Sequence, residues 1–406
     1  MNTRAALRRL RQPWLVAFDS LVMCRLPAAR PDPRRVLAVR LDAIGDFVLW
    51  LDAARALRRL YPPPDFHITL LGNQAWTSLA ERLPCFDEVW PLDGRRFHQS
   101  PTYRSRILSQ VRAAGFSIAI QPTYTRETCN GDAIIRATGA PRRIGFGRSA
   151  PDARLWGDRW YTQLIPARSG TLMELLRNAE FARWIGVSDF RARLPELPAG
   201  WPLPASVAGL DYFILVLGAS MDVKRWPPGS FAQAAERLRR ETGWSAVLCG
   251  GPGETSLGLS FEQLAPGLPL VNLIGKTSLN ELVAVVKGAR LVISNDTGPV
   301  HIAAAVGTPA VCIVGGGHFG RFLPYAVEAE AEADAQQAPS AGSPRRSHAP
   351  AAVHYPMPCY GCGWHCIYRP PRGQPAPCVS QVSVETVWQA IRPHLPRRDP
   401  PQSTAG

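Results

Sequence analysis

The chain has 406 residues, of which 46% are hydrophobic, so it is long enough for two domains with full cores and too apolar to be disordered. It carries 46 Lys and Arg against 32 Asp and Glu, and its net charge of +14 at pH 7 favours an anionic partner. The arginines are spread rather than interleaved with aromatic residues, so nucleic acid is not the expected partner. A phosphorylated substrate and an anionic membrane surface remain as the expected anionic partners.

The N-terminal segment, residues 1–33, is basic and has apolar residues at helical spacing. Asp19 interrupts the apolar run and no small-residue cleavage pattern follows, so a signal peptide is not expected. The alternatives are a peripheral membrane helix, an extra helix packed on the domain, and a frayed tail. Pro13 weakens both helical alternatives. No apolar run in the chain reaches the ~18–20 residues of a membrane span.

Residues 34–196 alternate between strand and helix patterns, which is typical of a parallel sheet covered by helices. The expected strands are 36–41, 67–71, 88–92, 117–121 and 143–146, and the expected helices include 46–60 and 103–114. A Pro/Gly-rich segment, 197–210, then predicts an interdomain linker.

The alternation restarts over residues 211–326. The expected strands are 212–217, 246–249, 290–294 and 310–314, with helices at 231–242, 279–287 and 301–306. Two doubly wound α/β domains that face each other across a cleft are the economical architecture, and ligands of such sheets bind at the carboxyl ends of the strands. We expect the remainder to be a low-complexity insertion (327–357), a cysteine-containing segment with a final helix at 384–391 (358–393) and a disordered tail (394–406).

The most informative stretch, residues 294–301, predicts a strand end, a tight loop and a helix start. Thr297 is a good N-cap, a proline is tolerated in the first helical turn, and Gly307 ends the helix. Such a start presents backbone N–H groups and the positive end of the helix dipole to an anion. Asp296 adds a carboxylate for hydroxyl groups and His301 an imidazole about one turn inside. The alternative is an ordinary capped helix.

Three further loops follow expected strands. In residues 40–46, Gly45 permits close approach of a ligand, and Asp46 is placed to act as a general base or simply to complement the helix dipole. In residues 218–227, Ser220 and the pair Lys224-Arg225 suit a diphosphate, although a solvated basic turn is the alternative. The rarity of lysine, found only at positions 224, 276 and 287, favours the functional interpretation of this loop.

In the third loop, residues 250–254, Glu254 is placed to bind a ribose hydroxyl pair. Its glycine spacing is neither a dinucleotide fingerprint nor a phosphate loop ending in Gly-Lys-Ser/Thr, which argues against NAD chemistry and NTP hydrolysis.

Nine cysteines without a signal peptide predict a reducing compartment. Four of them form a cluster spaced C-x2-C-x3-C-x11-C around His365, namely Cys359, Cys362, Cys366 and Cys378. Zinc or an iron–sulfur centre is one interpretation. Reduced thiols that pack a C-terminal loop are the favoured one, so no metal is assigned.

Over residues 34–319, and more weakly to Ile391, the chain resembles glycosyltransferase family nine, the heptosyltransferase-like enzymes of lipopolysaccharide core assembly. The resemblance is carried by four motifs in order, at 40–46, 218–227, 275–279 and 296–301. It implies a GT-B fold, in which the first Rossmann-like domain binds the acceptor and the second mainly the nucleotide sugar. It also implies metal-independent transfer with inversion and no cofactor.

The resemblance also implies residue roles. Asp46 matches the general base, Lys224 the cation that neutralises the leaving diphosphate, and Thr297 and Gly298 the amide donors to its phosphates, which His301 supports. Asp296 matches a position that holds donor sugar hydroxyls, and three further positions match the donor lining: Ser220, Glu254 and Thr277.

The expected function is transfer of a sugar, heptose from ADP-heptose, onto a lipid-linked lipopolysaccharide core acceptor. The expected location is cytoplasmic, with peripheral attachment to the anionic inner face of the membrane. The alternatives are transfer of another nucleotide-activated sugar to a cell-surface glycan, a GT-B-fold sugar-nucleotide epimerase, and a non-catalytic binding protein that keeps the fold.

Overall fold

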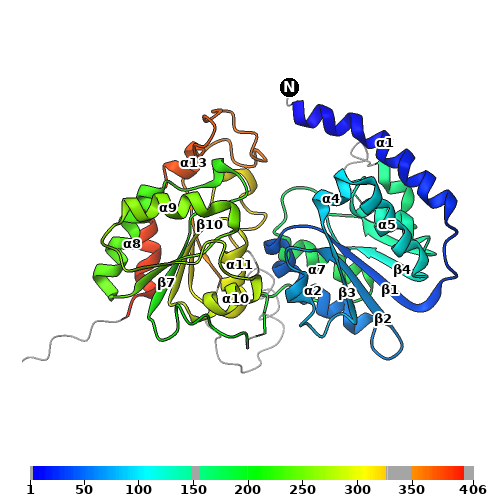
Figure 1. Cartoon of the computed structure of the whole chain (residues 1–406), viewed down its shortest axis with the longest axis horizontal. Helices are drawn as coiled ribbons and strands as arrows, with labels where there is room; N and C mark the ends of the chain where they lie inside the picture. Colours follow the sequence, from blue (N-terminus) through cyan, green and yellow to red (C-terminus); the bar gives the residue numbers. More distant parts are fainter. Residues whose placement is uncertain (1–2, 148–155, 199, 326, 328–348, 397–406) are drawn as a thin grey trace, which may run out of the picture. The chain divides into compact units, whose positions relative to one another are not determined.

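The computed structural model describes residues 3–147, 156–198, 200–325, 327 and 349–396. The chain folds into two compact units, Met1–Arg193 and Leu194–Gly406 (Figure 1). Each unit is built on a six-stranded parallel sheet with helices packed against it, which confirms the α/β class.

The first sheet has the strand order β3-β2-β1-β4-β5-β6, so the chain winds outward in both directions from the central pair β1 and β4. The middle of β1, Val36 to Val39, is fully buried, as expected for a strand covered on both faces. The strands are β1 (Asp32–Arg40), β2 (His67–Asn73), β3 (Glu88–Leu92), β4 (Phe116–Gln121), β5 (Arg142–Phe146) and β6 (Gln163–Ile165).

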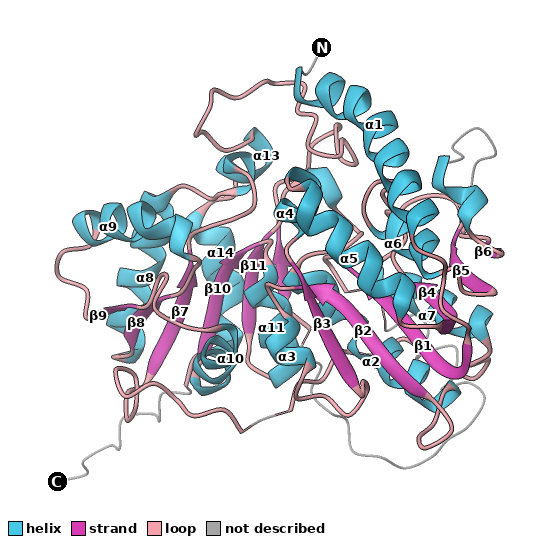
Figure 2. Cartoon of the chain, turned by 45° about the vertical axis from the view of Figure 1, so that its right-hand side comes forward, coloured by secondary structure: helices cyan, strands magenta, loops and turns pink. Residues whose placement is uncertain are grey.

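Two groups of helices pack against this sheet: α2 with α7, and α5 with α6 and α1 (Figure 2). The long helices are α1 (Thr3–Arg25), α2 (Ile44–Leu60), α5 (Pro101–Ala113), α6 (Gly131–Thr138) and α7 (Glu174–Ile185). Two short helices, α3 (Thr77–Ala80) and α4 (Gly94–Gln99), lie in the connections.

Helix α1 runs unbroken through Pro13, so the expectation that this proline weakens a helix here is wrong. The physical reason lies in its second half, where Asp19 is fully buried and pairs with Arg104 of α5 at 2.5 and 2.6 Å. This tertiary anchor holds the helix against the local cost of the proline. The residue that interrupts the apolar sequence is therefore the one that docks α1 on the domain.

The second sheet has the order β12-β11-β10-β7-β8-β9, and all of its pairs are parallel. The strands are β7 (Tyr212–Val216), β8 (Ser245–Leu248), β9 (Leu270–Asn272), β10 (Leu291–Asn295), β11 (Ala310–Ile313) and β12 (Ala351–Val353). Strand β12 lies inside the segment predicted to be a low-complexity insertion, 327–357, and extends the sheet. Within that segment, 328–348 lie outside the described residues, as do 397–406 of the predicted tail.

The helices of the second unit are α8 (Pro228–Thr242), α9 (Thr255–Leu264), α10 (Leu279–Gly288), α11 (Gly298–Val306), α13 (Pro377–Ser380) and α14 (Val384–Ile391). Ser278 and Glu281 form a capping box at the start of α10. Part of the segment predicted to be a linker packs on this unit, because the Leu197 N–H donates to Ala305 O at 2.9 Å and Val207 is fully buried.

All strands of each sheet point the same way, so the loops that follow them gather at one edge. In the second unit these are the loops after β7, β8, β10 and β11. Among the described residues, no helix is long and apolar enough to cross a membrane.

Candidate active site

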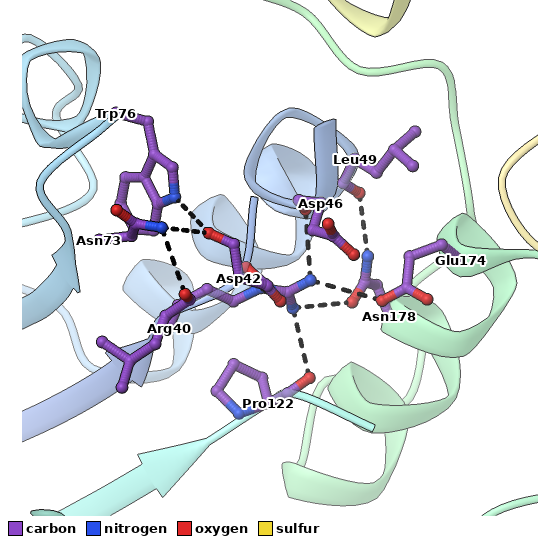
Figure 3. A network of polar contacts seen from close by, with 10 residues as sticks. Arg40, Asp42, Asp46, Leu49, Asn73, Trp76, Pro122, Glu174 and Asn178 are labelled. Atoms are coloured by element: carbon purple, nitrogen blue, oxygen red, sulfur yellow. Dashed lines mark hydrogen bonds and ion pairs between the residues drawn. The ribbon is translucent and has the colours of Figure 1, made fainter. Parts of the chain in front are cut away.

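In the first unit, the buried guanidinium of Arg40, at the end of β1, organises the loop that leads into α2 (Figure 3). Its Nε donates to Asp42 Oδ1 at 3.0 Å, and its Nη2 donates to the main-chain carbonyl of Asp46 at 3.2 Å. The remaining N–H groups reach the end of β4 and helix α7, at Pro122 O (3.3 Å), Asn178 Oδ1 (3.2 Å) and Glu174 Oε1 (3.4 Å). One cation thus joins four segments at the strand ends.

This network places two acids beside one cation in a buried position. Burial raises the pKa of Asp42 above its ordinary value, and the nearby Glu174 adds to the rise, while Arg40 partly offsets both. Removing the cation would leave the acids without compensation, so the loop geometry depends on Arg40.

Asp46 occupies the first turn of α2 and is half-buried. The N-cap residue Ala43 provides no side-chain hydrogen bond, so an acid in this turn also complements the helix dipole. Arg40 fixes the main chain at Asp46, and a fixed backbone is what a general base at this position requires. The assignment of Asp46 as the base remains a prediction.

In the second unit, fully buried Asn295 at the end of β10 ties together the loops that carry the predicted donor residues. Its Nδ2 donates to Leu217 O at 2.8 Å and Gly218 O at 3.3 Å, at the exit of β7. Its Oδ1 accepts the Trp226 N–H at 2.9 Å. This side chain was not among the predicted site residues, and the available signal was a polar residue that ends an apolar strand.

The structure brings Lys224 and Asp296 into direct contact. Lys224 Nζ lies 3.2 Å from Asp296 Oδ2 and donates to the Asp296 carbonyl at 3.1 Å, and both residues are buried. The neighbouring cation of the predicted pair, Arg225, instead pairs with Asp222 at 2.7 Å. Lys224 alone of the two is therefore directed to the start of α11.

Thr297 occupies the N-cap position of α11, Pro299 lies in its first turn and Gly307 ends it with a φ of 78°, as predicted. The Thr297 side chain makes no capping hydrogen bond, so Thr297 contributes to the helix start only through its extended main chain. Thr297 and Gly298 are both half-buried, directly after the carboxylate that holds Lys224. Their role as amide donors to phosphate stays a prediction.

His301 lies in the first turn of α11 and is buried. Its Nδ1 lies 2.7 Å from Tyr325 Oη, and the two rings are stacked. Burial raises the pKa of Tyr325 well above its ordinary value, so its hydroxyl stays protonated. Burial, aided by the cations Arg321 and Lys224, lowers the pKa of His318. Sequence reasoning missed Tyr325 and His318, although both follow β11 and so reach the same sheet edge.

The other three predicted donor-lining residues lie in separate loops. The Glu254 carboxylate accepts the Gly251 N–H at 3.0 Å and packs so closely on Gly218 that a Cβ there would overlap it. This contact joins the loops after β7 and β8. Ser220 is exposed in the Lys224 loop, and Thr277 is half-buried just before the cap of α10.

The four clustered cysteines are free thiols in the second unit. The Sγ of buried Cys378 accepts the Gly316 N–H at 3.4 Å. Within the described ranges, no three His, Cys, Asp or Glu side chains are arranged to hold a metal ion. The contact of Cys378 fits a thiol that packs the loop.

Comparison with known proteins now identifies the family. The model of glycosyltransferase family 9 (heptosyltransferase) matches residues 191–347. The lipopolysaccharide heptosyltransferase 3 of Escherichia coli K12 is 32% identical over 284 residues, which cover 67% of this chain and 79% of that protein. The chain therefore belongs to glycosyltransferase family 9 and is a heptosyltransferase-like glycosyltransferase.

Solved structures show the fold. A family 9 glycosyltransferase from Veillonella parvula matches 90% of this chain and 98% of its own with a TM-score of 0.63 at 19% identity. The E. coli heptosyltransferase WaaC with ADP-2-deoxy-2-fluoro heptose matches 88% of this chain and 99% of its own, with a TM-score of 0.60 at 17% identity. Both confirm the predicted GT-B fold of two Rossmann-like units.

Replacing Arg40 by methionine tests the network in Figure 3. We expect Arg40→Met to lower the free energy of unfolding by about 3–5 kcal/mol, because it leaves the buried Glu174 and the half-buried Asp42 without their cation. Arg55→Met is the matched control, since Arg55 is a partly exposed partner of Asp52 on α2 and should cost about 0–1 kcal/mol. Urea unfolding monitored by circular dichroism measures both, and equal losses would contradict the central role of Arg40.

Proposed function

We propose that the protein transfers heptose from ADP-heptose to a lipopolysaccharide core acceptor, with inversion at the anomeric carbon and without a metal ion. The observation that carries the proposal is the buried Lys224, held by Asp296 at the start of α11. The choice of heptose and ADP is supported by the 32% identical relative, a lipopolysaccharide heptosyltransferase, and by the ADP-linked fluoroheptose in WaaC.

In the proposed reaction, the bond between the anomeric carbon and the β-phosphate oxygen breaks, and negative charge builds on the departing ADP. The Lys224 ammonium and the N-terminal amides of α11 are fixed groups that stabilise charge where it develops. They supply the positive charge that a divalent cation would otherwise provide. Asp296 would exchange its partner, from the Lys224 ammonium to hydroxyls of the donor sugar.

On the acceptor side, the Asp46 carboxylate takes the proton of the acceptor hydroxyl while that oxygen attacks the anomeric carbon. The attack comes from the face opposite the leaving diphosphate, so the configuration inverts. Asp46 belongs to the first unit and Lys224 to the second, so the proposal requires both to reach one donor–acceptor pair.

Transfer is tested by mass spectrometry with ADP-heptose and core acceptors truncated at successive sugars. We expect ADP release only when an acceptor is present, one heptose added to that acceptor, an inverted linkage by NMR, and unchanged rates in EDTA. Consumption of donor without acceptor would favour an epimerase. Transfer from a different nucleotide sugar alone would show that the proposed donor is wrong.

The base assignment is tested by Asp46→Asn. We expect the transfer rate to fall about 100- to 10,000-fold, because the amide cannot accept the acceptor proton, while ADP affinity measured by calorimetry stays unchanged. Asp52→Asn, six residues further along α2, is the matched control and should keep full activity. A rate for Asp46→Asn within a factor of three of the wild type would exclude Asp46 as the base.

We also propose that α1 attaches the protein to an anionic membrane surface. Its sequence holds five arginines and one acid, and that acid, Asp19, is buried against Arg104. Trp14 and Leu21 are 79% and 52% exposed, and their i, i+7 spacing places them on one face of the helix. Exposed apolar residues in a helix of basic composition are typical of interfacial helices.

Co-sedimentation with vesicles of phosphatidylglycerol and phosphatidylethanolamine tests the attachment. We expect the double variant Trp14→Ser, Leu21→Ser to bind about tenfold more weakly than the wild type, because it loses apolar area at the interface. Leu259→Ser, an equally exposed leucine on α9, is the control. Undiminished binding of the double variant would exclude this face of α1.

A further inference from the structure

The cysteine-containing loop, residues 359–376, carries an aromatic side chain to the predicted phosphate site. Lys224 Nζ lies over the indole of Trp364, 5.2 Å from the ring centroid. The same ring meets His318 edge-on, at 6.2 Å between centroids. All three residues belong to the second unit, although Trp364 lies 140 residues beyond Lys224 in the chain.

The backbone of the loop is bound to the glycine run that follows β11, Gly315 to Gly317. The Gly361 N–H donates to Gly316 O at 2.8 Å, and the Gly363 N–H donates to Gly317 O at 3.0 Å. A Cβ at Gly315 or Gly317 would overlap the Trp364 ring. The glycine run lacks side chains where the indole packs, so the ring lies directly against the main chain of Gly315 and Gly317.

Two features of Trp364 oppose this placement. Its φ is 65°, in the left-handed region that bulky residues avoid. Its Nε1 is buried without a hydrogen-bond partner, which costs free energy relative to water. Strained residues persist only where the surrounding structure holds them, and they cluster at functional sites. Here the ring contacts Lys224, the cation that pairs with Asp296 at the start of α11.

We propose that Trp364 is a positioning residue for Lys224, and this rests on the proposed role of Lys224 toward the leaving diphosphate. The negative face of the indole attracts the ammonium group, which Asp296 holds through its carboxylate and carbonyl. When a diphosphate replaces Asp296 as the partner of the Lys224 ammonium, Asp296 becomes available to bind sugar hydroxyls, and the Trp364 ring keeps Nζ in place. The ring also excludes water from the ammonium, which strengthens its attraction for phosphate.

The test is the affinity of nucleoside diphosphates for the full-length protein, measured by calorimetry with ADP, UDP and GDP. For the diphosphate that binds the wild type best, we expect Trp364→Leu to weaken binding about tenfold and Trp364→Phe, which keeps a ring, to recover most of it. Tyr368→Leu, an exposed aromatic residue of the same loop, should bind as the wild type does. In a Lys224→Met background, Trp364→Leu should have almost no further effect.

The double-mutant cycle of Trp364→Leu and Lys224→Met separates a positioning role of Trp364 from a general structural role. An equal loss from Trp364→Leu with and without Lys224 would overturn the proposal, as would unchanged affinity in the single variant or a wild type that binds none of the three diphosphates. Because product binding is measured without sugar transfer, a wild type that binds ADP and transfers no heptose would refute the proposed function and leave the role of Trp364 standing.

Discussion

The arrangement of the second unit depends on the burial of one ammonium group. A buried lysine is stable only with partners that replace water, and Lys224 finds them in the carboxylate and carbonyl of Asp296 and the indole of Trp364. These contacts form only if three conditions of the fold are met. Asp296 must directly follow β10, Asn295 must bind the exit of β7, and the cysteine-containing loop must return to the glycine run after β11.

The first unit also depends on a buried cation, in this case an arginine. Arg40 is fully buried, and its guanidinium joins the ends of β1 and β4 to the starts of α2 and α7. Arginine suits this place because its planar group donates in several directions at once. In both units, a buried cation contacts the segment that carries the predicted chemistry. Arg40 binds the main chain at Asp46 in the first unit, and Lys224 binds Asp296 at the start of α11 in the second.

Much of the fold could be predicted from the sequence, because strand and helix patterns depend on residues that are close together in the chain. Apolar runs followed by helical patterns predicted both sheets, and Pro299 and Gly307 predicted the ends of α11. Strands β6, β9 and β12 were missed because three residues carry no periodicity. The effect of Pro13 on α1 was predicted wrongly, because the ion pair of Asp19 with Arg104 that anchors the helix joins residues far apart in sequence. For the same reason no pattern could place Trp364 on Lys224, or Tyr325 on His301.

The proposed function requires that Lys224 and the start of α11 bind the diphosphate of the donor. A crystal structure with ADP bound tests it most directly. We expect phosphate oxygens within hydrogen-bond distance of Lys224 Nζ and of the main-chain N–H groups at Thr297 or Gly298, with the Lys224–Asp296 contact opened. A diphosphate bound elsewhere on the second unit, with that ion pair intact, would contradict it.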